Sequence, residues 1–278
     1  MFKKKKLLSI FVSVSLALIL SMSLFLAGCN GGGSEPRTDA EMINVTSGVL
    51  TIGSDCDYPP FVQMQGDKPV GFEPEILQAI ADELGLELEY LPPQNFDTIL
   101  ASVASGTKMD VGASSFTITD ERKQLVSFSL PYFDSNQAAV ALISTSYTSA
   151  MDFDGLTVGA QSGTTGADWV RENLTGSGTT LKEFNQASEL MASLAAGDIQ
   201  AAFFDEPAAA QYVATSYTNC HIVEVIPTGE QYGFAVSKDN PGLLQAINDA
   251  MISLKKDGTF DRIFLKYFPD LKPPSLGT

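Results

Sequence analysis

Short apolar runs alternate with amphipathic helical patterns along most of the chain. In Glu75–Leu84 the apolar positions recur on one helical face, with Pro74 in the first turn and Gly85 at the end. The predicted strands are Val49–Gly53, Leu86–Tyr90, Met109–Ala113, Leu156–Ala160, Leu181–Phe184 and Ile199–Phe204, and the other predicted helices are Phe96–Ser105 and Ala167–Asn173. This alternation predicts an α/β architecture with largely parallel sheets.

The two halves of the chain contain a similar unit. Ala101–Gly106 is a predicted helix end that leads into a strand ending at Ser114, and Ala192–Gly197 leads in the same way into a strand ending at Asp205. Ligands of open α/β sheets bind outside the carboxyl ends of the strands, so we expect the two polar ends to face each other across a binding site. Chance recurrence of helix-glycine-strand units is the alternative explanation.

The first polar end has the features of a carboxylate site. Ser114, Ser115 and Thr117 precede Thr119–Glu121, which is typical of a helix start, and the unpaired N–H groups at a helix start attract anions. Arg122 adds a planar fork of donors that matches a carboxylate at two points. A surface ion pair between Arg122 and the neighbouring acids is the alternative.

The second polar end supplies the opposite charge. Asp205 follows the apolar run Ala201–Phe204, so its carboxylate would be partly desolvated and would favour a nearby cation. Because Glu206 and Pro207 come next, a helix N-cap is the alternative role for this aspartate.

A glycine-containing loop in the same half is suited to an anion. Residues Gln161–Gly166 join a predicted strand to a predicted helix, and backbone N–H groups around Thr164 and Thr165 would point at a ligand there. The loop lacks the Gly-Lys-Ser/Thr sequence of a P-loop, so nucleotide binding is not predicted. A plain glycine-rich turn is the alternative.

Two aromatic residues and an acid are placed to contact the rest of a ligand. Tyr58 and Asp55 lie in a proline-stiffened loop after the first strand, and Phe96 begins the helix after the second strand. The rings would flank a ligand side chain, and Asp55 would meet a positive tip through charge. Each ring taken singly is also an ordinary candidate for the core.

The first 28 residues have the pattern of a lipoprotein signal peptide. Four lysines precede the apolar stretch Leu7–Leu26, and Leu26-Ala27-Gly28-Cys29 matches the pattern in which cleavage leaves a lipid-modified Cys29. An uncleaved transmembrane anchor is the alternative, because about twenty apolar residues span a bilayer. Residues 29–48 are expected to form a flexible tether that holds the folded part at the extracytoplasmic face of the cell membrane.

Charge excludes nucleic acid as a partner. Residues 1–28 contain four of the 17 basic residues and none of the 33 acids, so the mature chain has 13 basic residues and a net charge of −20. Cys56 and Cys220 are the remaining cysteines besides Cys29, and they are either paired or free. No metal-ligand cluster or cofactor motif is visible, and the single His221 has no obvious catalytic partner.

Several short motifs, each weak alone, occur in a characteristic order. They are Asp57-Tyr58-Pro59-Pro60-Phe61, Val70-Gly71-Phe72-Glu73, Phe96-Asp97-Thr98-Ile99-Leu100, Thr117-Ile118-Thr119-Asp120-Glu121-Arg122, Gln161-Ser162-Gly163-Thr164-Thr165, Phe204-Asp205, Tyr232-Gly233-Phe234-Ala235-Val236 and Leu254-Lys255-Lys256-Asp257-Gly258-Thr259-Phe260. In this order the chain resembles the extracellular solute-binding proteins of family 3, the polar amino-acid receptors of ABC importers, from about Val49 to Phe268.

The resemblance implies a two-lobed clamshell of the type II periplasmic-binding-protein kind. Each lobe would be a mixed, mostly parallel sheet flanked by helices, and two hinge strands near Ala138–Ile143 and Tyr232–Val236 would join the lobes. Lobe 1 would comprise residues 49–142 plus 234–278, and lobe 2 would comprise residues 143–233.

The resemblance also implies roles for individual residues. An α-carboxylate would be held by Arg122, Thr117 and Thr165, an α-ammonium by Asp205 and Ser115, and a ligand side chain would lie against Tyr58 and Phe96. Val62 stands where an acid often occurs in the family, and Cys56 lies within the pocket loop, so the side-chain specificity stays open.

The expected function is that of an extracytoplasmic amino-acid receptor. A monomer without a cofactor would bind a free amino acid, with basic or other polar ones favoured, and deliver it to an ABC permease and its ATPase. A dehydratase-like enzyme on the same scaffold and a receptor for a different carboxylate are the alternatives.

Overall fold

A computed structural model describes residues 42–174 and 178–277 of the chain, so the predicted signal peptide and Cys29 lie outside the described residues. Within the described part, no helix is both long and apolar enough to cross a membrane. Residues Asp39–Thr278 form one compact unit that contains two five-stranded sheets and a small three-stranded one.

The first five-stranded sheet has the strand order β5-β1-β6-β13-β7. Its strands are β1 (Val49–Gly53), β5 (Glu87–Tyr90), β6 (Val111–Gly112), β7 (Ser127–Phe128) and β13 (Ala235–Val236). Strand β1 pairs in parallel with β5 and β6, while β13 runs antiparallel to β6 and β7. A hairpin-like sheet of β2 (Asp57–Tyr58), β3 (Val62–Gln65) and β4 (Lys68–Val70) lies in the chain between β1 and the first helix.

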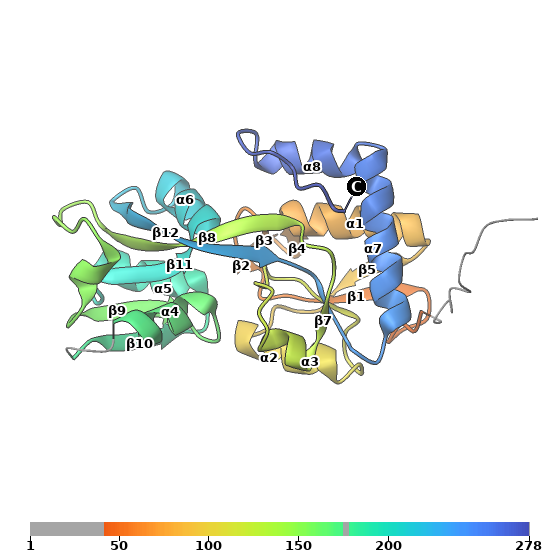
Figure 1. Ribbon diagram of the computed structural model, residues 1–278, viewed down its shortest axis with the longest axis horizontal. Coiled ribbons are helices and arrows are strands. Elements are labelled where there is room, and N and C mark those ends of the chain that lie inside the picture. The colour runs from red at the N-terminus through yellow and green to blue at the C-terminus, as the bar shows by residue number, and fades with distance from the viewer. Residues whose placement is uncertain (1–41, 175–177, 278) are drawn as a thin grey trace, which may run out of the picture. The chain divides into compact units, whose positions relative to one another are not determined.

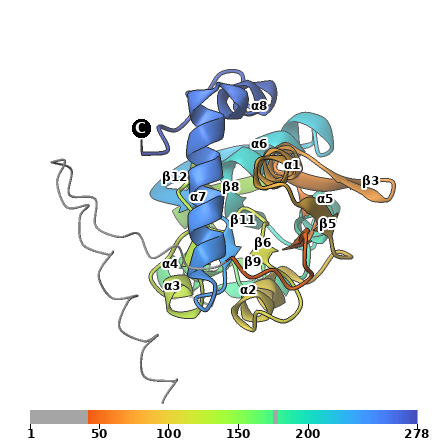
Figure 2. The ribbon, with the colours of Figure 1, turned by 90° about the vertical axis from the view of Figure 1, so that its right-hand side faces the viewer.

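Helices cover both faces of the first sheet, and together they form what we call the first lobe. The helices are α1 (Phe72–Leu84), α2 (Phe96–Ala104), α3 (Arg122–Leu125), α7 (Pro241–Lys256) and α8 (Thr259–Tyr267). Helices α1, α7 and α8 pack on one another on one side, and α2 and α3 lie on the other side (Figures 1 and 2). The sheet is therefore buried on both faces, as its apolar strands predict.

Helix α1 begins earlier than the pattern predicted. It starts at Phe72 rather than Glu75, and Pro74 occupies its third position, where the missing N–H group would have had no partner within the helix. Gly85 ends the helix in the left-handed conformation with φ 69°. The buried face includes Ile76 and Ile80, as the apolar period predicted.

The second five-stranded sheet has the order β10-β9-β11-β8-β12, and with its helices it forms the second lobe. Its strands are β8 (Phe133–Leu142), β9 (Thr157–Gln161), β10 (Thr180–Phe184), β11 (Ala201–Asp205) and β12 (Cys220–Tyr232), and its helices are α4 (Thr165–Asn173), α5 (Ala187–Ala196), α6 (Glu206–Thr215) and the 3-10 helix Ala150–Phe153. Alternate residues of β11 face opposite sides: Ala202 and Phe204 pack with α5 and α6, while Ala201 and Phe203 pack with α4. The fold class is thus α/β with two mixed sheets.

The chain crosses between the lobes twice, and one of the two crossings lies at a different point from the one that we expected. Ala138–Ile143 was the expected first hinge, but Ala138–Leu142 lies within β8 and pairs with β11 or β12 of the second sheet. The first crossing therefore lies between β7 and β8, and residues 133–142 belong with the second sheet rather than the first lobe. The second expected hinge, Tyr232–Val236, spans the end of β12 and the start of β13 (Figure 1).

The segment before β1 is held against the first lobe. The Val45 N–H donates to Asp110 Oδ1 at 2.7 Å, and the Ile43 N–H donates to Asn240 Oδ1 at 3.3 Å. Asp110 is buried and also accepts from the Thr51 N–H at 2.8 Å, so its carboxylate ties this segment to β1. The part of the expected tether from residue 43 to 48 is therefore fixed rather than flexible.

Candidate functional site

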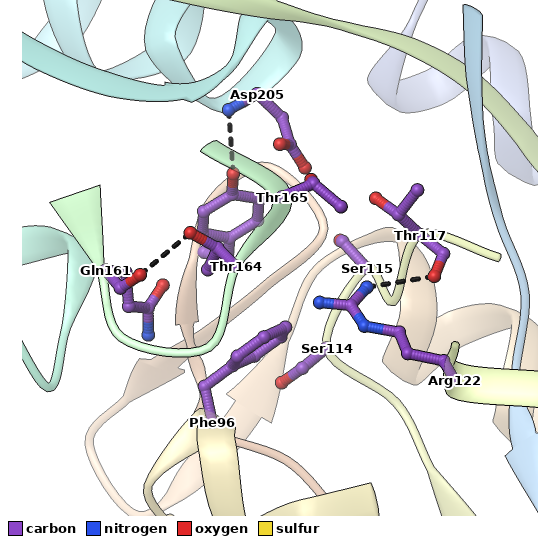
Figure 3. Close-up of a pocket in the computed structure, with 10 residues that line it drawn as sticks. Phe96, Ser114, Ser115, Thr117, Arg122, Gln161, Thr164, Thr165 and Asp205 are labelled. Carbon is purple, nitrogen blue, oxygen red and sulfur yellow. Dashed lines mark hydrogen bonds between the residues drawn. The ribbon is translucent and has the colours of Figure 1, made fainter. Parts of the chain in front are cut away.

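Nine of the ten side chains predicted to bind a ligand line one small cavity between the lobes. The lining residues are Tyr58, Phe96, Ser114, Ser115, Thr117, Arg122, Gln161, Thr164, Thr165 and Asp205. Figure 3 shows Asp205 at one end, Phe96 with Ser114 at the other, and Arg122 and Gln161 on opposite sides. The cavity volume is about 10 Å³, roughly the room of one water molecule, so a ligand enters only when the lobes move apart.

Arg122 is turned into this cavity and not toward the acids beside it in the sequence. Its Nη1 donates to the Thr117 carbonyl and its Nη2 to the Gly163 carbonyl of the second lobe, both at 2.9 Å. The guanidinium carbon also lies 5.5 Å from the centre of the Phe96 ring. Asp120 pairs with Lys123 instead, so the alternative of a surface ion pair is wrong for Arg122.

The predicted helix start next to Arg122 is present but short. Thr119 Oγ1 accepts from the Arg122 N–H at 3.1 Å, and the helix that follows, α3, has only four residues. Because the dipole of a helix sums over its length, a single turn offers little positive potential, and the expectation of an anion site at a helix terminus is wrong here. The guanidinium is the cationic group of this lobe's site.

The turn after β6 is fixed by a buried acid. Ser115 has φ 51°, and its N–H donates to Glu73 Oε1 at 2.7 Å; the Tyr132 hydroxyl donates to the same oxygen. Burial raises the pKa of Glu73 to about 7, against the hydrogen bonds from Tyr132 and Ser115, which lower it. Glu73 thereby holds Ser115 at the cavity wall.

Asp205 is a buried acid at the end of β11, and it does not cap the following helix. Helix α6 has no side-chain cap, and the Asp205 carboxylate instead accepts from the Tyr232 hydroxyl and from Gln137 Nε2. Burial, and then the nearby charge of Glu230, raise the pKa of Asp205 to about 7. The N-cap alternative is therefore wrong, and the aspartate faces the cavity.

The two predicted aromatic side chains differ in what they contact. Phe96 is stacked on Phe116, with ring centres 4.6 Å apart, and forms the end of the cavity opposite Asp205. Tyr58 is buried and its hydroxyl accepts from the Asp205 N–H at 3.2 Å, so it connects the lobes at the acid end. Both rings therefore line the cavity and also belong to the packed core.

Asp55 is the one predicted residue that does not line the cavity. It is 1% exposed, its Oδ1 accepts from Ser114 Oγ at 2.7 Å, and its Oδ2 accepts from Gln161 Nε2 of the second lobe at 3.0 Å. Burial raises its pKa, against these hydrogen bonds. Its oxygens thus lie directly behind Ser114 and Gln161, toward the Phe96 end.

The loop of the second lobe holds its threonines by a helix cap. Thr164 is the N-cap of α4, accepting from the Ala167 N–H at 3.2 Å and donating to the Gln161 carbonyl at 2.8 Å. Gly163 has φ 74°, and a side chain there would lie 3.0 Å from Asp97 of the first lobe. The loop therefore approaches the first lobe closely, which suits a site that closes by lobe contact.

Sequence reasoning missed three polar residues at this site. Gln161 was recognised only as part of a loop, and Gln137 and Glu230 were not recognised at all. Gln137 is 1% exposed and precedes the apolar run Ala138–Leu142. This position could have been recognised from the sequence, because a buried amide in a core strand needs hydrogen-bond partners. Glu230 is two residues from Tyr232, but a register irregularity between Ile226 and Glu230 makes its face unpredictable.

Other chemistry is limited in the described part of the chain. No group of three metal-ligating side chains occurs there, and Cys56 and Cys220 are both buried free thiols. Burial raises the pKa of Cys56 to about 11, so this thiol is a poor nucleophile. His221 lies on β12 in register with Ala141 and does not line the cavity.

Comparison with known proteins agrees with this geometry. A family model described as bacterial extracellular solute-binding proteins, family 3, matches residues 50–270. The chain belongs to this family. Its fold is the two-lobed one of amino-acid-binding proteins, as the related structures show.

Two curated relatives and one solved structure illustrate the similarity. The L-cystine-binding protein TcyJ of Escherichia coli (strain K12) is 34% identical over 80% of this chain and 83% of its own length. A probable histidine-binding protein of Neisseria gonorrhoeae is 27% identical over 91% and 94%. An ancestral arginine-binding protein bound to arginine is 38% identical, with a TM-score of 0.76 over 80% of this chain and 98% of that one. Each of these relatives is named as an amino-acid-binding protein.

Proposed function

We propose that this protein is an extracytoplasmic receptor that binds a free amino acid between its lobes, with a basic L-amino acid as the favoured ligand. The observation that supports this most is the charge arrangement of the cavity. A cationic Arg122 from the first lobe and an acidic Asp205 from the second lobe line the same space, and a zwitterion needs one partner of each sign.

The buried Asp55 supports a cationic side chain. Asp55 does not line the cavity, but its Oδ2 accepts from Nε2 of Gln161, which does, at 3.0 Å, so a ligand tip that displaced this amide would meet the carboxylate. A guanidinium or ammonium group reaching this end would neutralise an acid whose burial otherwise raises its pKa. The relatives are named for binding arginine, histidine or cystine. These names are consistent with a ligand that carries a second positive group, because cystine, too, has a second α-ammonium group.

Binding would proceed by closure. The contacts between lobes include Arg122 to Gly163, Gln161 to Asp55 and the Asp205 N–H to Tyr58. A ligand that touches Arg122 and Asp205 at once favours the form in which both are near it, and this differential affinity shifts the equilibrium toward closure. The closed protein would then dock on an ABC permease with its ATPase, as a monomer anchored through lipidated Cys29.

A stabilisation screen tests the proposal. The purified protein is heated with each common amino acid and with cystine, and at least one basic ligand is expected to raise the melting temperature by several degrees. Arg122→Ala and Asp205→Ala should abolish this shift, since each removes the partner of one zwitterion end. Arg171→Ala is the matched control because Arg171 is an exposed arginine paired with Asp168 and Glu183 away from the cavity.

Two results would contradict the proposal. One is the absence of stabilisation by any amino acid, and the other is an unchanged shift in both variants. Mass spectrometry of the released ligand separates a receptor from the alternative dehydratase-like enzyme, because a receptor returns the molecule chemically unchanged. Cys29→Ser, which should move the protein from the membrane fraction to the medium or periplasm, tests the anchor.

A further inference from the structure

The carboxylate of Glu230 reaches into the polar cluster where the two lobes meet. Glu230 lies on β12, yet its Oε2 accepts from Thr117 Oγ1 of the first lobe at 2.8 Å and from Thr165 Oγ1 of the second lobe at 3.0 Å. Figure 3 shows these two threonines on the Asp205 side of the pocket. One carboxylate oxygen therefore joins hydroxyls from both lobes.

These bonds determine what the two threonine hydroxyls can offer to a ligand. A hydroxyl has one proton and two lone pairs, so a hydroxyl that donates to Glu230 has only lone pairs left. Lone pairs accept from an ammonium group and repel a carboxylate. The Thr165 oxygen also accepts from Gln137 Nε2 at 3.1 Å, whereas no other hydrogen bond of the Thr117 hydroxyl is made within the described residues.

Gln137 extends the same pattern to Asp205. Its Nε2 lies 3.1 Å from each oxygen of Glu230 and also donates to Asp205 Oδ1. An amide nitrogen carries two hydrogens, whereas Gln137 Nε2 lies within hydrogen-bond distance of the Thr165 hydroxyl oxygen and of three carboxylate oxygens, so a further N–H group would be bound favourably. The neighbouring cation, Arg122, gives hydrogen bonds to two backbone carbonyls, and among the residues that the structure describes it forms no direct ion pair with either acid.

We propose that Glu230 is a positioning residue that, with Asp205, makes this end of the pocket select for an α-ammonium group. It does so by holding the Thr117 and Thr165 hydroxyls as acceptors and by adding negative charge beside Asp205. The inference rests on the proposed function. It places the Thr117 and Thr165 hydroxyls against the ammonium group, unlike the roles implied by the resemblance, and leaves the ligand carboxylate to Arg122. The receptor would thereby distinguish amino acids from the corresponding acids without an α-amino group.

The test compares two ligands that differ by the α-amino group alone. The probes are the amino acid selected by the stabilisation screen and its des-amino analogue, which is δ-guanidinovalerate for L-arginine and ε-aminocaproate for L-lysine. Titration calorimetry gives both dissociation constants for the natural protein and for Glu230→Gln. The ratio of the two constants is the readout, because a general loss of lobe packing weakens both ligands alike.

Glu230→Gln should raise the dissociation constant of the amino acid by about tenfold or more and should leave the dissociation constant of the des-amino probe unchanged or lower. Glu172→Gln is the matched control. Glu172 is an exposed acid that lines, together with Arg122 and Glu230, an open groove separate from the small cavity, and its replacement should leave both dissociation constants unchanged. Should Glu230→Gln fold poorly, Thr117→Val gives the same contrast, since it removes an acceptor for the ammonium group without removing a charge.

Equal weakening of both probes by Glu230→Gln or by Thr117→Val would overturn the inference and make Glu230 a connector of the lobes only. An unchanged ratio with unchanged affinities would also overturn it. Failure of the proposed function looks different, because the natural protein would then bind no amino acid in the screen.

Discussion

A contact between the lobes outside the cavity should strengthen the binding of a ligand to this protein. Asp57 of the first lobe accepts from the Ser188 N–H of the second lobe at 2.8 Å. Ser188 is in the first turn of α5, a helix that has no side-chain cap of its own. Asp57 thus caps a helix of the other lobe, and it can do so only when the lobes are together. Replacing it with alanine removes this bond and leaves the cavity lining intact.

The size of the effect follows from the type of bond. Loss of a helix N-cap to alanine costs about 0.5–2 kcal/mol, and hydrogen bonds to charged groups contribute about 1.5–3 kcal/mol. We take about 1–2 kcal/mol for the closed form, which corresponds to a factor of about 5–30 in the closing equilibrium. Because the ligand is held by the closed form, the dissociation constant of Asp57→Ala should rise by that factor.

Titration calorimetry with the ligand from the screen measures this directly. Asp57→Asn should lie between the natural protein and Asp57→Ala, since the amide oxygen still accepts from Ser188 but carries no charge. Asp67→Asn is the control, because Asp67 is an exposed acid in the neighbouring β3–β4 turn. A change of less than about twofold in Asp57→Ala would show that lobe contacts outside the cavity do not govern affinity. A changed order of preference among amino acids would equally refute it, because Asp57 does not touch the ligand space.

Two further predictions concern the acids of the site. The pKa of Asp205 is raised to about 7 by burial and by Glu230, with Tyr58, Tyr232 and Arg122 as its other ionisable neighbours. An ammonium ligand favours the ionised aspartate, so the affinity should be full above pH 7 and should fall by up to about tenfold per pH unit below it. Calorimetry at several pH values measures this, and a flat profile from pH 5.5 to 8.5 would contradict it. Asp55→Asn should weaken the binding of basic amino acids by about tenfold and the binding of neutral ones little. Equal weakening for both classes in a binding screen would show that Asp55 does not recognise the ligand side chain.

The sequence predicted the strands well where they are apolar and buried. The expected strand Val49–Gly53 agrees with β1 to the residue, and the expected strand Leu156–Ala160 differs from β9 by one residue at each end. Polar residues at the ends of such strands are predictable, because the carboxyl ends of α/β strands share one edge. This is why Ser114 and Asp205 were identified in advance and lie at the same cavity.

The features that were not predicted depend on contacts between residues that lie far apart in the chain. The apolar run in β8 is compatible with either sheet, and only its pairing with β11 and β12 places it in the second lobe. Glu230 was not predicted, because the register shift in β12 interrupts the alternation of side chains that indicates which face of the sheet a residue lies on. The expected helix after Thr119 is a single turn, since the chain goes on directly into β7.

The two strands that join the lobes form one paired ribbon, and this limits the motion available for closure. Strands β8 and β12 remain paired to their ends despite two register shifts: Phe133 pairs with Tyr232, and Tyr232 also bridges to Thr117 of the first lobe. The Tyr132 N–H donates to the Tyr232 carbonyl at 3.0 Å at the crossing itself. Sliding of one strand past the other would break these bonds, so the pairing opposes sliding of the lobes and leaves bending and twisting of the ribbon as the motions that separate them. The expected motion of the lobes is therefore a rotation at this joint, which would carry a change at the cavity to the outer edges of both lobes.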